Sequence, residues 1–181
     1  MNYYFLAASL PSLSLDSPPP LSFDQFRALC AEHFTPGEMR ALDELRSPVT
    51  EDARDAFVSG WRHREVRLRN AVARARAARL QKDPAACVRE QQGFDASEER
   101  AVADAFAKNT PADRELALDR FRWKQIEELA GFDMFSPRAL LAYGLKLRLA
   151  ERWAGMSEEK GRAQAEEMVG RGQPARAQHT P

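Results

Sequence analysis

The stretch that decides the fold is residues 51–81, EDARDAFVSGWRHREVRLRNAVARARAARLQ, where no proline and one glycine, Gly60, interrupt a helical pattern. Thr50 precedes this stretch and can cap a helix, because its side-chain oxygen can accept a hydrogen bond from a free backbone N–H group of the first turn. Roughly thirty residues at about 1.5 Å each predict a rod on the order of 45 Å long. Apolar residues recur at helical spacing and define one narrow stripe along it: Phe57, Trp61, Leu68, Val72 and Ala75.

The second half of this rod is strongly basic. Residues 61–82 hold eight Lys or Arg side chains against one acidic residue, Glu65. Arg62, Arg69 and Arg76 recur every seven residues, so they form a stripe that could contact an acidic partner or a phosphate backbone. Residues 90–119, with eight acidic and three basic side chains, could instead neutralise the rod within the same chain.

Capping patterns divide the rest of the chain into shorter helices. Ser22 with Gln25, and Thr35 with Glu38, have the spacing of capping boxes. The patterns predict helices over residues 23–34, 36–46, 96–108, 111–130, 137–153 and 157–169, with a helical turn or two at 84–91. No alternation of strands and helices supports an α/β sheet. We therefore predict an all-α protein, an elongated helical bundle built around one long helix.

The predicted domain organisation has three parts. Residues 1–21 form an apolar N-terminal arm, either extended or a short first helix, with a proline-rich spacer. Residues 22–155 form the helical domain, and residues 156–181 a charged helix with a disordered tail. A chain of 181 residues can bury one real core, or two small ones.

The composition indicates the compartment. Charged residues make up 30% of the chain, yet its net charge is zero. Cys30 and Cys87 fit no metal-binding spacing and are typical of reduced cytosolic thiols. No stretch approaches the ~20 apolar residues needed to span a bilayer, and the N-terminus lacks the basic region of a signal peptide. We expect a soluble, cytoplasmic protein.

Residues that could carry catalysis are scarce. The chain has no glycine-rich phosphate loop, no nucleophile elbow and no paired-histidine zinc motif. The three histidines are scattered, and the acidic pairs 98–99 and 127–128 are adjacent residues that do not face one another on a helix. We expect no enzyme, no catalytic residue, no metal, no cofactor and no small-molecule substrate.

Three stretches carry a family resemblance: residues 3–11 (YYFLAASLP) with 21–26 (LSFDQF), residues 68–76 (LRNAVARAR), and residues 132–149 (FDMFSPRALLAYGLKLRL). Together they resemble a bacterial family of unknown function whose genes lie within V/A-type ATPase operons. The second stretch is similar to the Asn-Leu-x-x-x-x-Arg helix signature of the central-stalk C subunit of that ATPase, called subunit d in eukaryotes, with Asn70 and Arg76 at the matching positions. The third is similar to a segment of the same group in which a proline precedes an apolar helix.

The resemblance implies a non-catalytic subunit or accessory of a V/A-type rotary ATPase, a C/d-like adaptor between the ATP-hydrolysing head and the membrane rotor ring. Its partners would be stalk and ring subunits, and it would lie at the inner membrane only through them. The candidate partner-binding residues are Arg62, Arg69, Arg76, Asn70, Tyr3 and Tyr4. The alternative is a basic-helix nucleic-acid-binding module, which is disfavoured because no aromatic residue except Trp61 is interleaved with the arginines.

Overall fold

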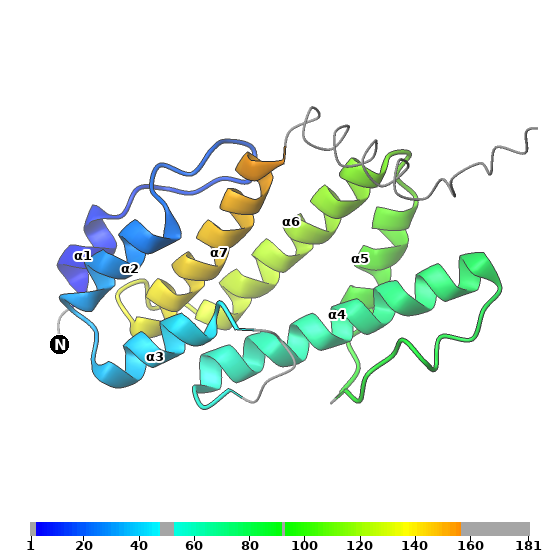
Figure 1. Ribbon diagram of the computed structural model, residues 1–181, viewed down its shortest axis with the longest axis horizontal. Helices are drawn as coiled ribbons and strands as arrows, with labels where there is room; N and C mark the ends of the chain where they lie inside the picture. The colour runs from blue at the N-terminus through cyan, green and yellow to red at the C-terminus, as the bar shows by residue number, and fades with distance from the viewer. Residues whose placement is uncertain (1–2, 48–52, 92, 157–181) are drawn as a thin grey trace, which may run out of the picture.

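The computed structural model describes residues 3–47, 53–91 and 93–156, which form seven helices and no strand (Figure 1). The predicted all-α class is confirmed. The helices are α1 (Tyr4–Ser9), α2 (Phe23–Ala31), α3 (Pro36–Glu44), α4 (Ala56–Leu80), α5 (Ala96–Phe106), α6 (Pro111–Ala130) and α7 (Pro137–Gly155). The predicted helix over 157–169 and the tail lie outside the described residues.

The long helix α4 begins later than predicted, at Ala56. Asp55 caps it: Oδ1 accepts hydrogen bonds from the backbone N–H groups of Phe57, at 2.8 Å, and Val58, at 3.2 Å. A carboxylate at this position also interacts favourably with the positive end of the helix dipole. Thr50, the predicted cap, lies outside the described residues. The helix ends where Gln81 adopts a left-handed conformation, with φ of 52°.

Both predicted capping boxes are present. In each, the side-chain oxygen of the Ser or Thr cap accepts a hydrogen bond from the backbone N–H of the third helical residue. The side chain of that third residue accepts a hydrogen bond from the backbone N–H of the cap, as with Ser22 and Gln25. Helices α2 and α3 nevertheless end earlier than predicted. The segment 84–91 is not a helix: it makes one turn, in which the Val88 N–H bonds the Pro84 carbonyl at 3.1 Å.

The N-terminal segment packs on the bundle. Its first part is the short helix α1, whose Leu6 is buried in the core. The chain then runs without helix to α2, with Leu10, Leu13 and Leu21 packed against the same core. The Tyr143 hydroxyl of α7 donates a hydrogen bond to the Pro11 carbonyl at 2.9 Å. Of the two predicted forms of the arm, the short helix is present over residues 4–9, and residues 10–21 form no helix.

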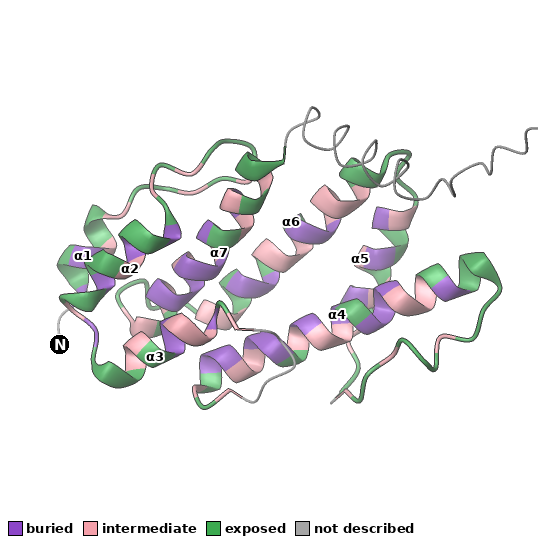
Figure 2. Cartoon of the chain, in the orientation of Figure 1, coloured by how far each residue is buried: buried purple, intermediate pink, exposed green. Residues whose placement is uncertain are grey.

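The described residues bury two hydrophobic cores. The first combines α1, α2, α3 and α7 with the beginning of α4 and the end of α6. The second lies among the rest of α4, α5 and the earlier part of α6. The apolar stripe of α4 is divided between them, with Phe57 and Trp61 in the first core and Leu68 and Val72 in the second. Figure 2 shows buried residues along most of α7 and exposed ones at the far end of α4.

Charged residues with buried or largely covered side chains lie on α4, α5 and α6, the helices that border the junction of the two cores. We call Glu65, Arg67, Glu98, Asp119 and Arg122 the polar belt. The Arg122 guanidinium contacts Glu65 Oε2 through Nε and Asp119 Oδ1 through Nη1, both at 2.8 Å. Arg67 contacts Glu98 at 3.0 Å. The belt therefore ties α4 to both α5 and α6.

Candidate partner-binding surfaces

Three ion pairs neutralise part of the basic surface of α4. Arg67 contacts Glu98, and the next pair along the helix joins Arg74 Nη2 to Glu99 Oε1 at 2.6 Å. Arg76 Nη2 lies 3.7 Å from Glu115 Oε1. The acidic stretch 90–119 thus packs against the basic rod, which is the intramolecular alternative that the sequence left open.

A cleft of about 880 Å³ opens between the end of α3, the first half of α4, and α7. We call it the arginine cleft. Among the described residues it is lined by seven arginines: Arg46, Arg62, Arg69, Arg89, Arg122, Arg148 and Arg152. Three glutamates, Glu44, Glu65 and Glu151, also line it, which leaves a net charge of +4. No lysine lines it.

The floor of the cleft belongs to the polar belt. Burial by itself raises the pKa of Glu65, but the charges and hydrogen bonds of Arg122 and Arg69 outweigh it and hold that pKa below its usual value. Asp119, fully buried, accepts hydrogen bonds from Arg122, from Arg152 and from the Trp153 indole N–H at 2.7 Å. Glu65 in the cleft lining and the buried Asp119 therefore each hold two arginines of that lining.

The rim of the cleft is less well compensated. Within the described part of the chain, no carboxylate lies at ion-pair distance from the guanidinium of Arg89 or Arg148. Partial burial and the positive charge of Arg46 lower the pKa of Arg148, and Glu151 offsets this only in part. Arg46 contacts Asp24 at 2.8 Å, and Asp24 is not part of the cleft lining.

The three arginines that recur every seven residues, Arg62, Arg69 and Arg76, do not share one surface in the structure. Arg62 is only 5% exposed, lies in the cleft wall, and donates a hydrogen bond to the Glu44 carbonyl at 3.0 Å. Arg69 lies at the rim and is exposed, and Arg76 lies outside the cleft. Arg62 and Arg69 therefore share the cleft, while Arg76 faces Glu115 elsewhere.

Asn70 is buried and holds the segment 84–91 against α4. Its Nδ2 donates to the Arg89 carbonyl at 2.8 Å and to Gln91 Oε1 at 2.7 Å, and its Oδ1 accepts from the Arg89 N–H at 2.9 Å. We call this arrangement the Asn70 clamp. The side chain that the resemblance proposes for partner binding thus makes intramolecular contacts, and it fixes Arg89 at the cleft rim.

The two tyrosines of the arm have different environments. Tyr3 is buried, and its hydroxyl donates to Glu38 Oε1 at 2.8 Å. Burial, with the adjacent Glu38 carboxylate, raises the pKa of Tyr3 to about 12. Tyr4 is 50% exposed, and its ring centroid lies 4.7 Å from that of Phe135. Of the two, only Tyr4 is available to a partner at the surface.

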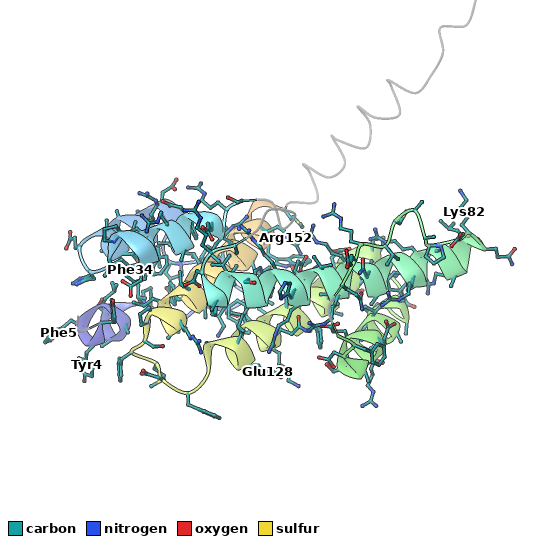
Figure 3. All side chains as sticks on the ribbon, turned by 90° about the horizontal axis from the view of Figure 1, so that it is seen from below. Tyr4, Phe5, Phe34, Lys82, Glu128 and Arg152 are labelled. Carbon is teal, nitrogen blue, oxygen red and sulfur yellow. The ribbon has the colours of Figure 1, made fainter. Side chains whose placement is uncertain are left out.

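Tyr4 belongs to an exposed apolar surface formed by α1 and the α6–α7 loop. We call it the aromatic tip: Tyr4, Phe5, Phe132, Met134 and Phe135. Phe5 is 74% exposed and Phe132 is fully exposed. Figure 3 shows Tyr4 and Phe5 at the end of the described chain opposite Lys82. Large apolar patches on a surface mark sites of interaction with proteins or membranes.

Sequence reasoning missed most residues of both surfaces. The spacing of Arg148 and Arg152, four residues apart on a largely apolar helix, could have indicated a basic face on α7. Likewise, the run FDMF between Gly131 and Ser136 places apolar residues in a predicted loop, where polar ones are expected. Arg89 had no such signal, because its position depends on the Asn70 clamp.

No group of three or more His, Cys, Asp or Glu side chains in the described ranges is arranged to hold a metal ion. None of the helices in those ranges combines the length and the apolar character that crossing a bilayer requires.

Comparison with known families finds one similarity. Residues 94–173 match a family described as "Protein of unknown function (DUF2764)". This range begins just before α5 and includes α6 and α7. No curated protein and no solved structure matches the chain.

Proposed function

We propose that this chain is a non-catalytic subunit or accessory of a bacterial V/A-type rotary ATPase, a C/d-like adaptor that couples the ATP-hydrolysing head to the membrane rotor ring. The identity of the complex rests on the resemblance of residues 3–26, 68–76 and 132–149. The third of these stretches lies within the range that matches a family of unknown function. Its proposed partners are the stalk and ring subunits.

The observation that carries an adaptor role is the aromatic tip. Tyr4 and Phe5 stand exposed at one end of the described chain, and Phe132, Met134 and Phe135 of the α6–α7 loop are exposed as well. The contact between Tyr4 and Phe135 joins α1 to the loop before α7, so residues distant in sequence form one surface. Covering such a surface with a partner removes apolar area from water and stabilises the complex by roughly 25 cal/mol per Å² before the cost of association.

The helical body suits the transmission of force. Helices α4 and α6 both extend through the two cores, and the polar belt joins them at the junction. A displacement at one end must therefore either move the whole body or break buried ion pairs. Rigid packed interiors transmit strain in this way.

The nucleic-acid alternative is less well supported. A duplex would need a continuous row of uncompensated cations, whereas Arg67, Arg74 and Arg76 contact Glu98, Glu99 and Glu115. Trp61 is buried in the first core and cannot stack on a base. Salt dependence distinguishes the two functions, since phosphate-backbone binding loses orders of magnitude in affinity between low and moderate salt.

The test is co-purification of the tagged full-length chain from membranes dissolved in mild detergent. We expect catalytic-head and ring subunits of a V/A-type ATPase in fixed ratio, retained at moderate salt. The double variant F5S/F132S should lose these subunits while its circular dichroism stays unchanged, because both side chains are exposed. L80S, at the exposed end of α4, is the matched control and should retain them.

Each outcome bears on a separate part of the proposal. Absence of ATPase subunits from the wild-type preparation would refute the assignment to this complex. Equal recovery with F5S/F132S and with L80S would refute the aromatic tip as the interface. The basic residues are tested by R69Q/R76Q, since Arg69 and Arg76 are exposed whereas Arg62 is buried. Unchanged assembly of that variant would exclude both from the interface.

A further inference from the structure

The arginine cleft has the size and charge of a small-molecule site. Its volume of about 880 Å³ falls within the range of typical ligand pockets, roughly 300 to 1,000 Å³. All its cationic side chains are arginines, which present planar donor forks that match phosphate and carboxylate oxygens. These come from the end of α3, from α4, from the segment 84–91, from α6 and from α7. They therefore surround the space from several sides.

Some of these arginines are already paired within the chain. Glu65 holds Arg69 and Arg122, and Asp119 holds Arg122 and Arg152. Arg89 and Arg148 have no such carboxylate among the described residues. These two side chains therefore add positive charge to the cleft that no ion pair within the described chain neutralises.

One rim arginine, Arg148, lies beside a like charge. Partial desolvation, together with the nearby charge of Arg46, lowers the pKa of Arg148. The Asn70 clamp fixes the backbone of Arg89 through two hydrogen bonds of 2.8 and 2.9 Å. Like charges held together in this way repel one another, and a bound anion would relieve that repulsion. An arrangement of this kind is preorganised for an anion.

We propose that the arginine cleft binds a small anion carrying two or more phosphate groups, with Arg89 and Arg148 as its principal contacts. A tetrahedral phosphate presents oxygens in several directions, which suits guanidinium groups arriving from several helices. An acidic helix would instead present carboxylates along one face. This proposal is independent of the adaptor function, and it adds a ligand where the sequence predicts no small-molecule substrate.

The same phosphate chemistry has two sources, a free di- or triphosphate and the phosphorylated headgroup of a lipid. The probe for the first is inorganic pyrophosphate, with ATP as a second, titrated into the full-length chain by calorimetry at about 0.15 M salt. The probe for the second is vesicles containing cardiolipin, whose headgroup carries two phosphates, compared with vesicles of phosphatidylcholine alone. If the lipid vesicles bind and pyrophosphate also binds, the lipid headgroup is a second ligand of the same site.

The variants R89Q and R148Q test the contacts. Hydrogen bonds to charged groups contribute enough that each change should weaken pyrophosphate binding about tenfold or more. R138Q is the matched control, because Arg138 is exposed on the same helix α7 but lies outside the cleft. Its affinity should equal that of the wild type. Thermal unfolding of each variant without ligand verifies that the fold is intact.

Three results would overturn the proposal. One is the absence of pyrophosphate binding to the folded wild-type chain. Another is an equal affinity of R148Q, R89Q and R138Q. The third is binding of a polyglutamate peptide or an oligonucleotide under conditions where pyrophosphate and cardiolipin do not bind. Failure of the ATPase co-purification would leave this result untouched, because calorimetry uses the isolated chain.

Discussion

Glu65 of α4 and Arg122 of α6 join the two cores at their boundary, with Oε2 and Nε 2.8 Å apart and side chains only 5% and 11% exposed. Arg122 also contacts Asp119, and Glu65 also contacts Arg69. A buried pair of this kind adds modest net stability compared with apolar packing, yet loss of one partner strands the other charge. The junction between the cores is therefore the place where a single substitution should cost most.

The first prediction concerns Arg122. R122M keeps much of the side-chain volume but leaves the Glu65 and Asp119 carboxylates buried with fewer partners. We expect a loss of about 3 kcal/mol or more in the free energy of unfolding, measured by urea denaturation. R76M is the control: its pair with Glu115 is exposed and 3.7 Å long, so the change should stay below about 1 kcal/mol. Equal midpoints for the two variants would show that the belt does not stabilise the fold.

The second prediction concerns pH. Glu65 has a lower pKa in the folded chain than in the unfolded chain, where a glutamate titrates near about 4.3. Its ionised form therefore stabilises the fold above that pH, and this contribution is lost as the pH falls through the lowered pKa of the folded state. E65Q should reduce the slope of unfolding free energy against pH in this acidic window, and lower stability at neutral pH.

The control for pH is E128Q, which removes an exposed carboxylate. Its pH profile should follow that of the wild type. The slope in E65Q should be reduced and not abolished, because the folded structure also lowers the pKa values of Glu38, Asp43 and Asp95. An E65Q profile parallel to that of the wild type below pH ~4.3 would contradict the prediction.

The polar belt shows how far the sequence predicts the fold. The predicted apolar stripe on α4 has a gap. The position four residues after Trp61 is occupied by Glu65. A lone acidic residue inside an apolar stripe, among eight basic neighbours, marks the division between the cores. The helices and capping boxes were predictable because they depend on neighbours in sequence. The predicted start of α4 is wrong because Asp55, also a good cap, begins the helix five residues after Thr50.

The candidate surfaces were much less predictable. The arginine cleft depends on Arg46, Arg89 and Arg148, which come from three separate segments that meet only in the folded chain. Arg62 was expected on an exposed face, but its side chain turns toward the Glu44 carbonyl and is buried. Spacing along one helix defines a face of that helix, but it cannot tell which neighbouring segment covers it.

The third prediction concerns the Asn70 clamp. N70D replaces the Nδ2 donor with an oxygen that faces two acceptors, the Arg89 carbonyl and Gln91 Oε1. We expect a loss of about 1 to 3 kcal/mol, because buried acceptors lose their donor. In the wild-type chain the Arg89 amide donates to Asn70 Oδ1. Hydrogen exchange of this amide should be faster in N70D. N109D is the exposed control and should change neither quantity. Unchanged protection of the Arg89 amide in N70D would show that other contacts hold this segment.

The fourth prediction compares two glycines inside helices. A Cβ atom added at Gly144 would lie 3.1 Å from Leu42 Cδ1 and 3.2 Å from Phe26 Cε1, in the first core. Overpacking of this kind costs about 1 to 3 kcal/mol, which exceeds the roughly 0.5 to 1 kcal/mol that alanine gains over glycine in a helix. G144A should therefore lower the thermal unfolding midpoint.

Gly60 is the matched comparison, because its added Cβ would meet a single side chain, Leu129, at 3.2 Å. Leu129 is only partly buried and can rotate away, so the helix-propensity gain should dominate and G60A should leave the midpoint unchanged or raise it. The order of the two midpoints is the quantity to measure. If G144A were at least as stable as G60A, then α7 would have room to move away from α2 and α3, and the first core would be less tightly packed there than these distances indicate.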